Sequence, residues 1–189
     1  MTSTRTLLLV ALSALVLSAC SYTINGDALP EAGFTPSSTP STTASGSSGG
    51  PPKIAKQRSV AGVDPCKLLT ADDVKPLGGL TKDPSRKDDV IPESCQFPVA
   101  DGTVVTALYK KYEEVQGRQP KGHEVVVDGN SSWVLCERDG SSTVCTTATA
   151  VNSTRTILVA MSLKGGNEDQ MVAVVQPMVK AAVNRLPAA

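Results

Sequence analysis

Apolar and polar residues alternate in the middle of the chain, and this period of two predicts β-strands that bury one face. Two such stretches, residues 95–99 and 104–112, flank Asp101-Gly102, a dipeptide typical of tight hairpin turns. A hairpin centred on that dipeptide fixes which residues face each other. The expected pairs are Val99 with Val104, Phe97 with Thr106, and Cys95 with Leu108.

Further strands are predicted at residues 124–127, 132–138, 143–150 and 154–163. A turn centred on Gly140-Ser141 places Cys136 directly opposite Cys145, at a separation that a disulfide can bridge. A centre one residue earlier is the more usual kind of turn, but it misaligns the two sulfurs. The cysteines therefore favour the later centre.

The turn after residue 150 decides which face of these strands is buried. We expect it to centre on Asn152-Ser153, which gives one apolar face and one half-polar face. The expected core face comprises Trp133, Leu135, Val144, Thr146, Ala148, Ile157, Val159 and Met161. The half-polar face is typical of a solvated sheet, and the alternative is a recognition surface. It comprises Ser132, Val134, Arg138, Thr143, Thr147, Thr149, Thr156 and the Cys136–Cys145 disulfide.

Two helices are predicted to flank the strands. A short helix begins at Thr70 as N-cap and ends before Gly78-Gly79, and a long helix capped by Asn167 runs to about residue 186, with a kink at Pro177. Residues 80–93 and 114–122 are predicted loops. An apolar stripe of the long helix is expected to lie across the sheet, and it contains Met171, Val174, Val175, Met178, Ala182 and Leu186.

These elements predict an α+β fold. Its antiparallel, curved sheet of about five or six strands is packed by the short N-terminal helix and the long C-terminal helix, and two disulfides staple it. Met171, Val175 and Met178 are read as core residues. The alternative is that these three line an apolar groove for a lipid-like ligand.

The N-terminus has the pattern of a lipoprotein signal peptide, residues 1–19. One positive charge precedes an uncharged run that ends in Leu17, Ser18 and Ala19, immediately before Cys20. This run is shorter than the roughly 20 residues that cross a bilayer. We expect cleavage before Cys20 and attachment of diacylglycerol and palmitate there. Two or three acyl chains then hold the protein on the extracytoplasmic side of the cell membrane.

Composition divides the rest of the chain in two. Residues 20–62 are rich in Ser, Thr, Pro and Gly without apolar periodicity, which predicts a disordered linker behind the lipidated cysteine. Residues 63–189 have the length of one domain with a core of its own. The expected organisation is therefore a signal peptide, a tether and a single α+β domain.

Cysteine usage fits an exported protein. Once Cys20 carries lipid, four of the five cysteines remain, and the hairpin pairs Cys136 with Cys145 and leaves Cys66 for Cys95. No metal site is expected, because no two cysteines have zinc-ligand spacing and His123 is the only histidine. No cofactor motif is found. Lys+Arg and Asp+Glu both total 18 and aromatic residues are few, so nucleic acid is not an expected partner.

Several residues together resemble a known family. They are Asp64-Pro65-Cys66, Leu68-Leu69-Thr70, Cys95-Gln96-Phe97 and the two later cysteines, behind the lipobox. In this combination the chain resembles an actinobacterial family of cell-envelope lipoproteins of unknown function, which often has Trp where this chain has Phe97. The resemblance implies an envelope location and an α+β domain, and it carries over no catalytic residue.

Three functions follow in order of support. No nucleophile, zinc-binding or phosphate-binding motif is present, so the first is a non-catalytic binding or accessory module of the cell envelope, with an envelope protein, a polymer or a lipid as its partner. The alternative is a carrier that holds a lipid or another apolar ligand between helix and sheet. A wall-modifying enzyme comes third.

Overall fold

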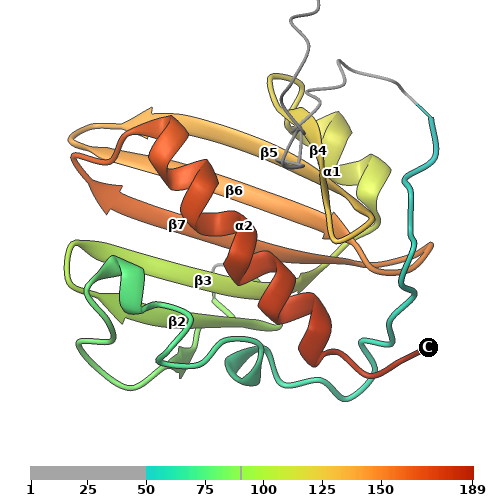
Figure 1. Ribbon diagram of the computed structural model, residues 1–189, viewed down its shortest axis with the longest axis horizontal. Helices are drawn as coiled ribbons and strands as arrows, with labels where there is room; N and C mark the ends of the chain where they lie inside the picture. Colours follow the sequence, from blue (N-terminus) through green and yellow to red (C-terminus); the bar gives the residue numbers. More distant parts are fainter. Residues whose placement is uncertain (1–49, 90) are drawn as a thin grey trace, which may run out of the picture. The chain divides into compact units, whose positions relative to one another are not determined.

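The computed structural model describes residues 50–89 and 91–189, which form a seven-stranded antiparallel sheet (Figure 1). The strand order is β1-β2-β3-β7-β6-β5-β4. The strands are β1 (Ser85–Arg86), β2 (Ser94–Val99), β3 (Gly102–Tyr109), β4 (His123–Val127), β5 (Asn130–Asp139), β6 (Ser142–Ala150) and β7 (Thr156–Lys164). The helices are the 3-10 turns η1 (Pro65–Lys67) and η2 (Lys75–Leu77), α1 (Tyr112–Arg118) and α2 (Glu168–Arg185).

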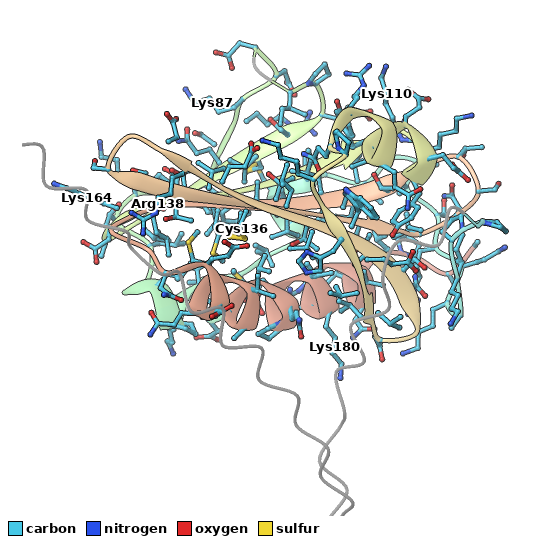
Figure 2. The ribbon with its side chains drawn as sticks, turned by 90° about the horizontal axis from the view of Figure 1, so that it is seen from above. Lys87, Lys110, Cys136, Arg138, Lys164 and Lys180 are labelled. Atoms are coloured by element: carbon cyan, nitrogen blue, oxygen red, sulfur yellow. A yellow bond between two sulfur atoms is a disulfide. The ribbon has the colours of Figure 1, made fainter. Side chains whose placement is uncertain are left out.

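The two α-helices lie on opposite faces of the sheet (Figure 2). Helix α2, with 18 residues, is about 27 Å long and crosses most of a sheet that is roughly 30 Å wide. Helix α1 has seven residues and is about 10 Å long. One face is therefore covered along its width, and the other is covered only near α1.

The α+β class, the antiparallel sheet and the C-terminal helix were predicted correctly, but the strand count was too low. The additional strand is β1, a two-residue edge strand that pairs with Cys95 and Gln96 inside the segment predicted as a loop. Two residues surrounded by charged neighbours give no periodicity to read. Ser85 and Arg86 form a strand only because they pair with β2, whose own alternation of apolar and polar residues is clear.

The expected short N-terminal helix is wrong. The chain forms a turn at residues 71–74, followed by η2 and Gly78 in the left-handed conformation. Asp73 accepts hydrogen bonds from the Thr70 backbone N–H and hydroxyl at 2.6 and 2.8 Å. The residues that were predicted to start a helix therefore stabilise only this turn. Pro76 has no N–H to donate to the carbonyl of Asp72, and an α-helix therefore cannot propagate.

The register of the β5–β6 hairpin was predicted correctly. Asp139 pairs with Ser142 around Gly140-Ser141, and Cys136 pairs with Cys145. In the β2–β3 hairpin the register differs from the expected one by one turn position. Val99 pairs with Gly102, so the turn centres on Ala100-Asp101, and Phe97 and Cys95 face Val104 and Thr106. The shift moves each partner by two residues, so every side chain stays on its expected face.

The connection between β6 and β7 reverses the expected faces of β5 and β6. It contains five residues instead of two, because the Asn152 side chain accepts hydrogen bonds from the backbone of Thr154 and Arg155, both at 2.9 Å. Ala148 consequently pairs with Leu158 instead of Ile157. A change of register by one residue exchanges the two sides of a strand. The expected outer face of these two strands is therefore buried beneath α2.

The main core lies between α2 and the sheet. Phe97, Val104, Met161 and Cys145 form one row of that sheet face, and α2 contributes a stripe at helical spacing. The stripe contains Met171, Val175, Met178, Val179, Ala182, Val183 and Leu186, each at most 2% exposed. Thr147 and Thr149, expected on a solvated face, are fully buried there. Pro177 lies on the exposed side of α2, where the helix continues through it.

A second, smaller core lies under α1. Residues 114–122 were predicted as a loop, but Tyr112–Arg118 is helical, and Tyr112 and Val115 pack against Trp133, Ala148 and Ala150. The prediction is wrong because Gly117 and the absence of a side-chain cap at Lys111 hide the helix. Its stability therefore comes from packing on the sheet, not from local signals.

Residues 53–60, expected in the linker, lie against the domain. Ser131 N–H donates to the Lys53 carbonyl at 2.8 Å, Arg58 N–H donates to the Val151 carbonyl at 2.8 Å, and Ser59 N–H donates to Pro187 at 2.9 Å. The fully buried Asn130 side chain bonds both the N–H and the carbonyl of Lys56. The ordered domain thus begins upstream of the boundary expected at residue 63.

Candidate functional site

The sheet face on the α1 side is open where the short helix ends. A row of half-buried residues crosses five strands there, and it consists of Gln96, Val105, Ala160, Thr146 and Leu135. The residues of the next row toward Trp133 are buried beneath α1 and the chain around it. Small and aliphatic side chains therefore form an accessible floor beside α1.

A hollow of about 390 Å³ lies at the start of α1. Its walls come from the segment before β2, the end of β3, the first turn of α1 and the β6–β7 connection. The lining residues are Pro92, Glu93, Leu108, Tyr109, Lys110, Lys111, Glu114, Thr154 and Arg155. This volume falls within the range of pockets that bind small molecules, roughly 300–1,000 Å³.

A second hollow, of about 190 Å³, lies farther along α1 and over the sheet. Leu158, Ala160 and Thr146 form its floor, and Ile91 and the last turn of α1 form its walls. The remaining lining residues are Tyr109, Val115, Arg118 and Gln119. The two hollows are adjacent, because Tyr109 lines both and Ile91 of the second hollow precedes Pro92 and Glu93 of the first. Residues of α1 line both hollows as well. We call the two hollows together the α1 groove.

One side of α1 supplies the charged wall of the α1 groove. Lys111, the N-cap of α1, lines the larger hollow, and Arg118, in the last turn, lines the second hollow with Val115. Figure 2 shows the neighbouring Lys110 on this side of the sheet, away from α2. Four cations and two carboxylates line the groove, in a chain whose total formal charge is zero. The lining is therefore locally positive.

Both carboxylates of the groove are already paired. Glu93 bonds Arg155 at 2.6 Å, and Glu114 lies 3.4 Å from Lys110. Among the described residues, no ion pair involves Lys111 or Arg118. The groove thus keeps cationic groups available for a ligand.

Two polar atoms of the groove residues are buried without a hydrogen-bond partner in the described chain. They are Nε of Arg155 and Oε1 of Gln119. The backbone carbonyl of Gln119, unlike its side-chain oxygen, has a partner, because it accepts a hydrogen bond from the indole N–H of Trp133 at 2.9 Å. Buried polar atoms without partners are uncommon in folded domains and concentrate at sites with a further role.

The backbone at the mouth of the groove is constrained. Glu93 has a φ of 54°, a left-handed conformation that residues with a side chain seldom adopt. Its carbonyl accepts the Leu108 N–H at 3.1 Å, and its carboxylate binds Arg155. These two contacts hold Glu93 between β3 and the β6–β7 connection, and so fix the outer wall of the larger hollow.

The predicted site residues have different outcomes. Both disulfides are confirmed, Cys66–Cys95 and Cys136–Cys145. Leu17, Ser18, Ala19 and Cys20 lie outside the described residues, so the lipidation site stays a prediction. Met171, Val175 and Met178 lie in the main core, and Met178 also borders a surface hollow with Pro76 and Pro177.

Few features of the sequence indicate the α1 groove. Its residues come from four separate segments, and the segment that contributes most was expected to be the end of a strand followed by a loop. The available signal was the spacing of Lys111, Val115 and Arg118, which places an apolar residue between two cations on one side of a helix. Within residues 50–89 and 91–189, no group of three His, Cys, Asp or Glu residues is placed to hold a metal ion.

Comparison with known proteins gives one family match. The family model is described as "Protein of unknown function (DUF3558)", and it matches residues 15–179. No curated protein and no solved structure matches the chain. Among the helices that the structure describes, none combines the length and the apolar character needed to cross a bilayer.

Proposed function

The chain belongs to the family described as protein of unknown function (DUF3558), and on that premise we propose that it is an exported lipoprotein that acts as a non-catalytic binding module of the cell envelope. In this proposal lipid at Cys20 holds the protein on the extracytoplasmic side of the cell membrane. The α1 groove is the binding site. The observation that carries the proposal is this groove, open on a face that the helices leave partly uncovered.

Two features support the proposed compartment. Disulfides persist in oxidising compartments, and the domain contains two of them. The lipobox-like sequence from Leu17 to Cys20 directs export and acylation. A chain held at a membrane by its N-terminus needs no membrane-spanning helix of its own.

The composition of the groove supports binding over catalysis. Its titratable residues are Lys, Arg and Glu with exposed ion pairs, together with Tyr109, and a nucleophile held by a base is missing from its lining. Apolar walls with a few polar groups at the rim are what ligand sites generally offer. The main core is packed tightly around Met171, Val175 and Met178, so the groove is the better place for a ligand.

The anchor is tested by the mass of the protein extracted from the membranes of its own host. We expect a chain that begins at Cys20 and carries diacylglycerol, and a Cys20→Ser variant that lacks the lipid. An unacylated chain in the membrane fraction would refute the anchor.

Binding is tested on the same protein by native mass spectrometry. We expect wild-type protein to retain a ligand, and an Ala160→Phe variant, which fills the floor of the second hollow, to lose it. Ala173→Phe is the matched control, because Ala173 is exposed on the other side of the sheet, where it lines the hollow beside Met178 and should not affect a ligand in the α1 groove. Equal ligand retention by the two variants, or none by the wild type, would count against the proposal.

A further inference from the structure

We propose that the ligand of the α1 groove is an anionic amphiphile, a molecule with one acidic head group and one unbranched hydrocarbon tail. The head group binds in the larger hollow beside Lys111 and Arg155, and the tail passes Tyr109 onto the floor of the second hollow. This inference rests on the proposed function and specifies its ligand.

The charge of the larger hollow selects the head group. Lys111 has no ion pair in the described chain and lies in the same lining as Arg155. Arg155 binds Glu93 through Nη2 alone, and its Nε has no partner. An acidic group between these two side chains gains a charge-assisted hydrogen bond from each. A neutral or cationic head group gains neither bond.

The floor of the second hollow selects the tail. Leu158, Ala160 and Val115 present aliphatic surface, and Thr146 presents a methyl group. Beyond the hollow, the open row continues through Val105 and Leu135 at the same level of the sheet. Each methylene group of a tail buried there contributes about 0.8 kcal/mol. A small inorganic anion leaves this surface uncovered and gains nothing from it.

A natural spectroscopic reporter lies beside the groove. Trp133 is the only tryptophan of the sequence, it is 5% exposed, and its indole N–H donates to the carbonyl of Gln119. Gln119 lines the second hollow. A tail that displaces Gln119 or excludes water beside it changes the surroundings of the indole. Tryptophan emission therefore reports occupancy without an added label.

The test is a fluorescence titration of the exported full chain carrying Cys20→Ser, so that no acyl chain of the protein competes. The probes are dodecanoate, monododecyl phosphate, dodecanol and inorganic phosphate. We expect saturable emission changes with the first two only. Comparing these two also separates a carboxylate source, a free fatty acid, from a phosphate source, a phospholipid-like head group.

Two substitutions locate the site. Lys111→Glu should weaken binding of dodecanoate by about tenfold, because attraction becomes repulsion at an exposed position. Lys180→Glu is the matched control, since Lys180 is exposed on the α2 side of the sheet, and it should leave the affinity unchanged (Figure 2). Ala160→Phe should abolish the emission change even where Lys111→Glu only weakens it.

Equal binding of dodecanol, binding of inorganic phosphate at the same concentrations, or equal effects of Lys111→Glu and Lys180→Glu would overturn the inference. A flat titration with both anionic probes would do the same. If the extracted protein keeps a ligand that depends on Ala160 while the titration is flat, the inference fails and the proposed function stands. If no ligand is retained and Cys20 is unmodified, the proposed function fails, and the inference that rests on it fails as well.

Discussion

Gly122 lies where the chain leaves α1 and passes Trp133 at close range. A Cβ atom at this position would collide with the indole of Trp133 and would lie 2.8 Å from the backbone oxygen of Val134. Neither neighbour can move freely, because the indole is bonded to Gln119 and the oxygen belongs to β5. The glycine therefore permits the close approach that buries Trp133.

A substitution at Gly122 tests this contact. Gly122→Ala should lower the free energy of unfolding by roughly 1–3 kcal/mol, as other overpacking substitutions do, and should shift the emission of Trp133. Gly117→Ala is the control, since a Cβ there meets nothing within 4 Å and the position is helical. It should raise the free energy of unfolding by about 0.5–1 kcal/mol. Urea unfolding of both variants checks this, and similar values for the two would contradict the packing described.

Among the residues that the structure describes, Tyr112 has the largest shift in pKa. Burial and then the nearby Glu124 carboxylate raise the pKa of Tyr112 above its ordinary value of 10.0. The hydroxyl is close enough to Glu124 to be influenced by its charge, but its geometry makes no hydrogen bond. The folded state therefore holds this proton more tightly than the unfolded state does.

This shift predicts an alkaline loss of stability. Tyrosine in the unfolded chain ionises above pH 10, so the contribution of Tyr112 is complete below that pH and declines as the pH rises past it. Tyr112→Phe should unfold with nearly wild-type free energy at pH 8, because no hydrogen bond is lost, and should lose less stability between pH 10 and pH 11. Urea unfolding across this range measures both. Parallel curves for the two proteins would exclude the role given to Tyr112.

At the scale of elements, the two disulfides stabilise different connections. Cys66–Cys95 spans 29 residues and ties η1 to β2, whereas Cys136–Cys145 spans nine residues within one hairpin. The entropy of closing a loop in the unfolded chain grows with its length. The longer closure should therefore contribute more to stability, and it also joins elements that no hairpin holds together.

The corresponding prediction compares two paired substitutions. Replacing both cysteines of the longer closure by Ser should cost roughly 3.6 kcal/mol, and replacing Cys136 and Cys145 should cost roughly 2.7 kcal/mol. Equilibrium unfolding gives both values. A larger loss for the hairpin disulfide would show that the sheet, and not the connection to η1, depends on the crosslinks.

Elements encoded by their own local sequence were predicted, whereas elements that depend on packing against distant parts of the chain were not. Strands β2 to β7, the β5–β6 register and the capped α2 are encoded by local alternation, paired cysteines and Asn167, and these were predicted. Helix α1 and β1 exist because the rest of the sheet packs or pairs with them, and both were missed. The faces of β5 and β6 were reversed by one loop. The side chain of Asn152 sets that loop to an odd length.

The same cause explains why the α1 groove was not predicted. A prediction that puts Trp133 and Ala148 beneath the long helix also places the open face of the sheet on the wrong side. Thr143, Thr147 and Thr149, expected on a solvated face with a recognition surface as the alternative, are buried on the α2 side. The accessible residues, such as Thr146 and Ala160, had been assigned to the core or given no role.

At the scale of the whole domain, residues 53–60 close one end of the sheet. Asn130 is the central contact, with its side chain bonded to the N–H and carbonyl of Lys56 at 3.1 and 3.2 Å and to the Ala150 carbonyl at 2.9 Å. Lys56 also pairs with Asp128 at 2.6 Å, and this contact lowers the pKa of Asp128.

This arrangement predicts protection from trypsin. Lys53, Lys56 and Arg58 are potential cleavage sites, and backbone hydrogen bonds at all three should make them resistant in the full chain. Asn130→Ala should expose them, with a cost of roughly 1–3 kcal/mol for the partners left unsatisfied. Asn184→Ala, at an exposed position of α2, is the control. Rapid cleavage of the wild type after these residues would show that the segment is not held.

Hydrogen exchange of the full chain carrying Cys20→Ser, with and without saturating dodecanoate, tests directly whether the α1 groove is the binding site. The ligand should slow exchange in peptides that cover residues 91–93 and 109–119, which border the α1 groove. Peptides that cover residues 171–178 of α2 should exchange at the same rate in both samples. Protection confined to α2 would instead place the ligand between helix and sheet, and would contradict the α1 groove as the binding site.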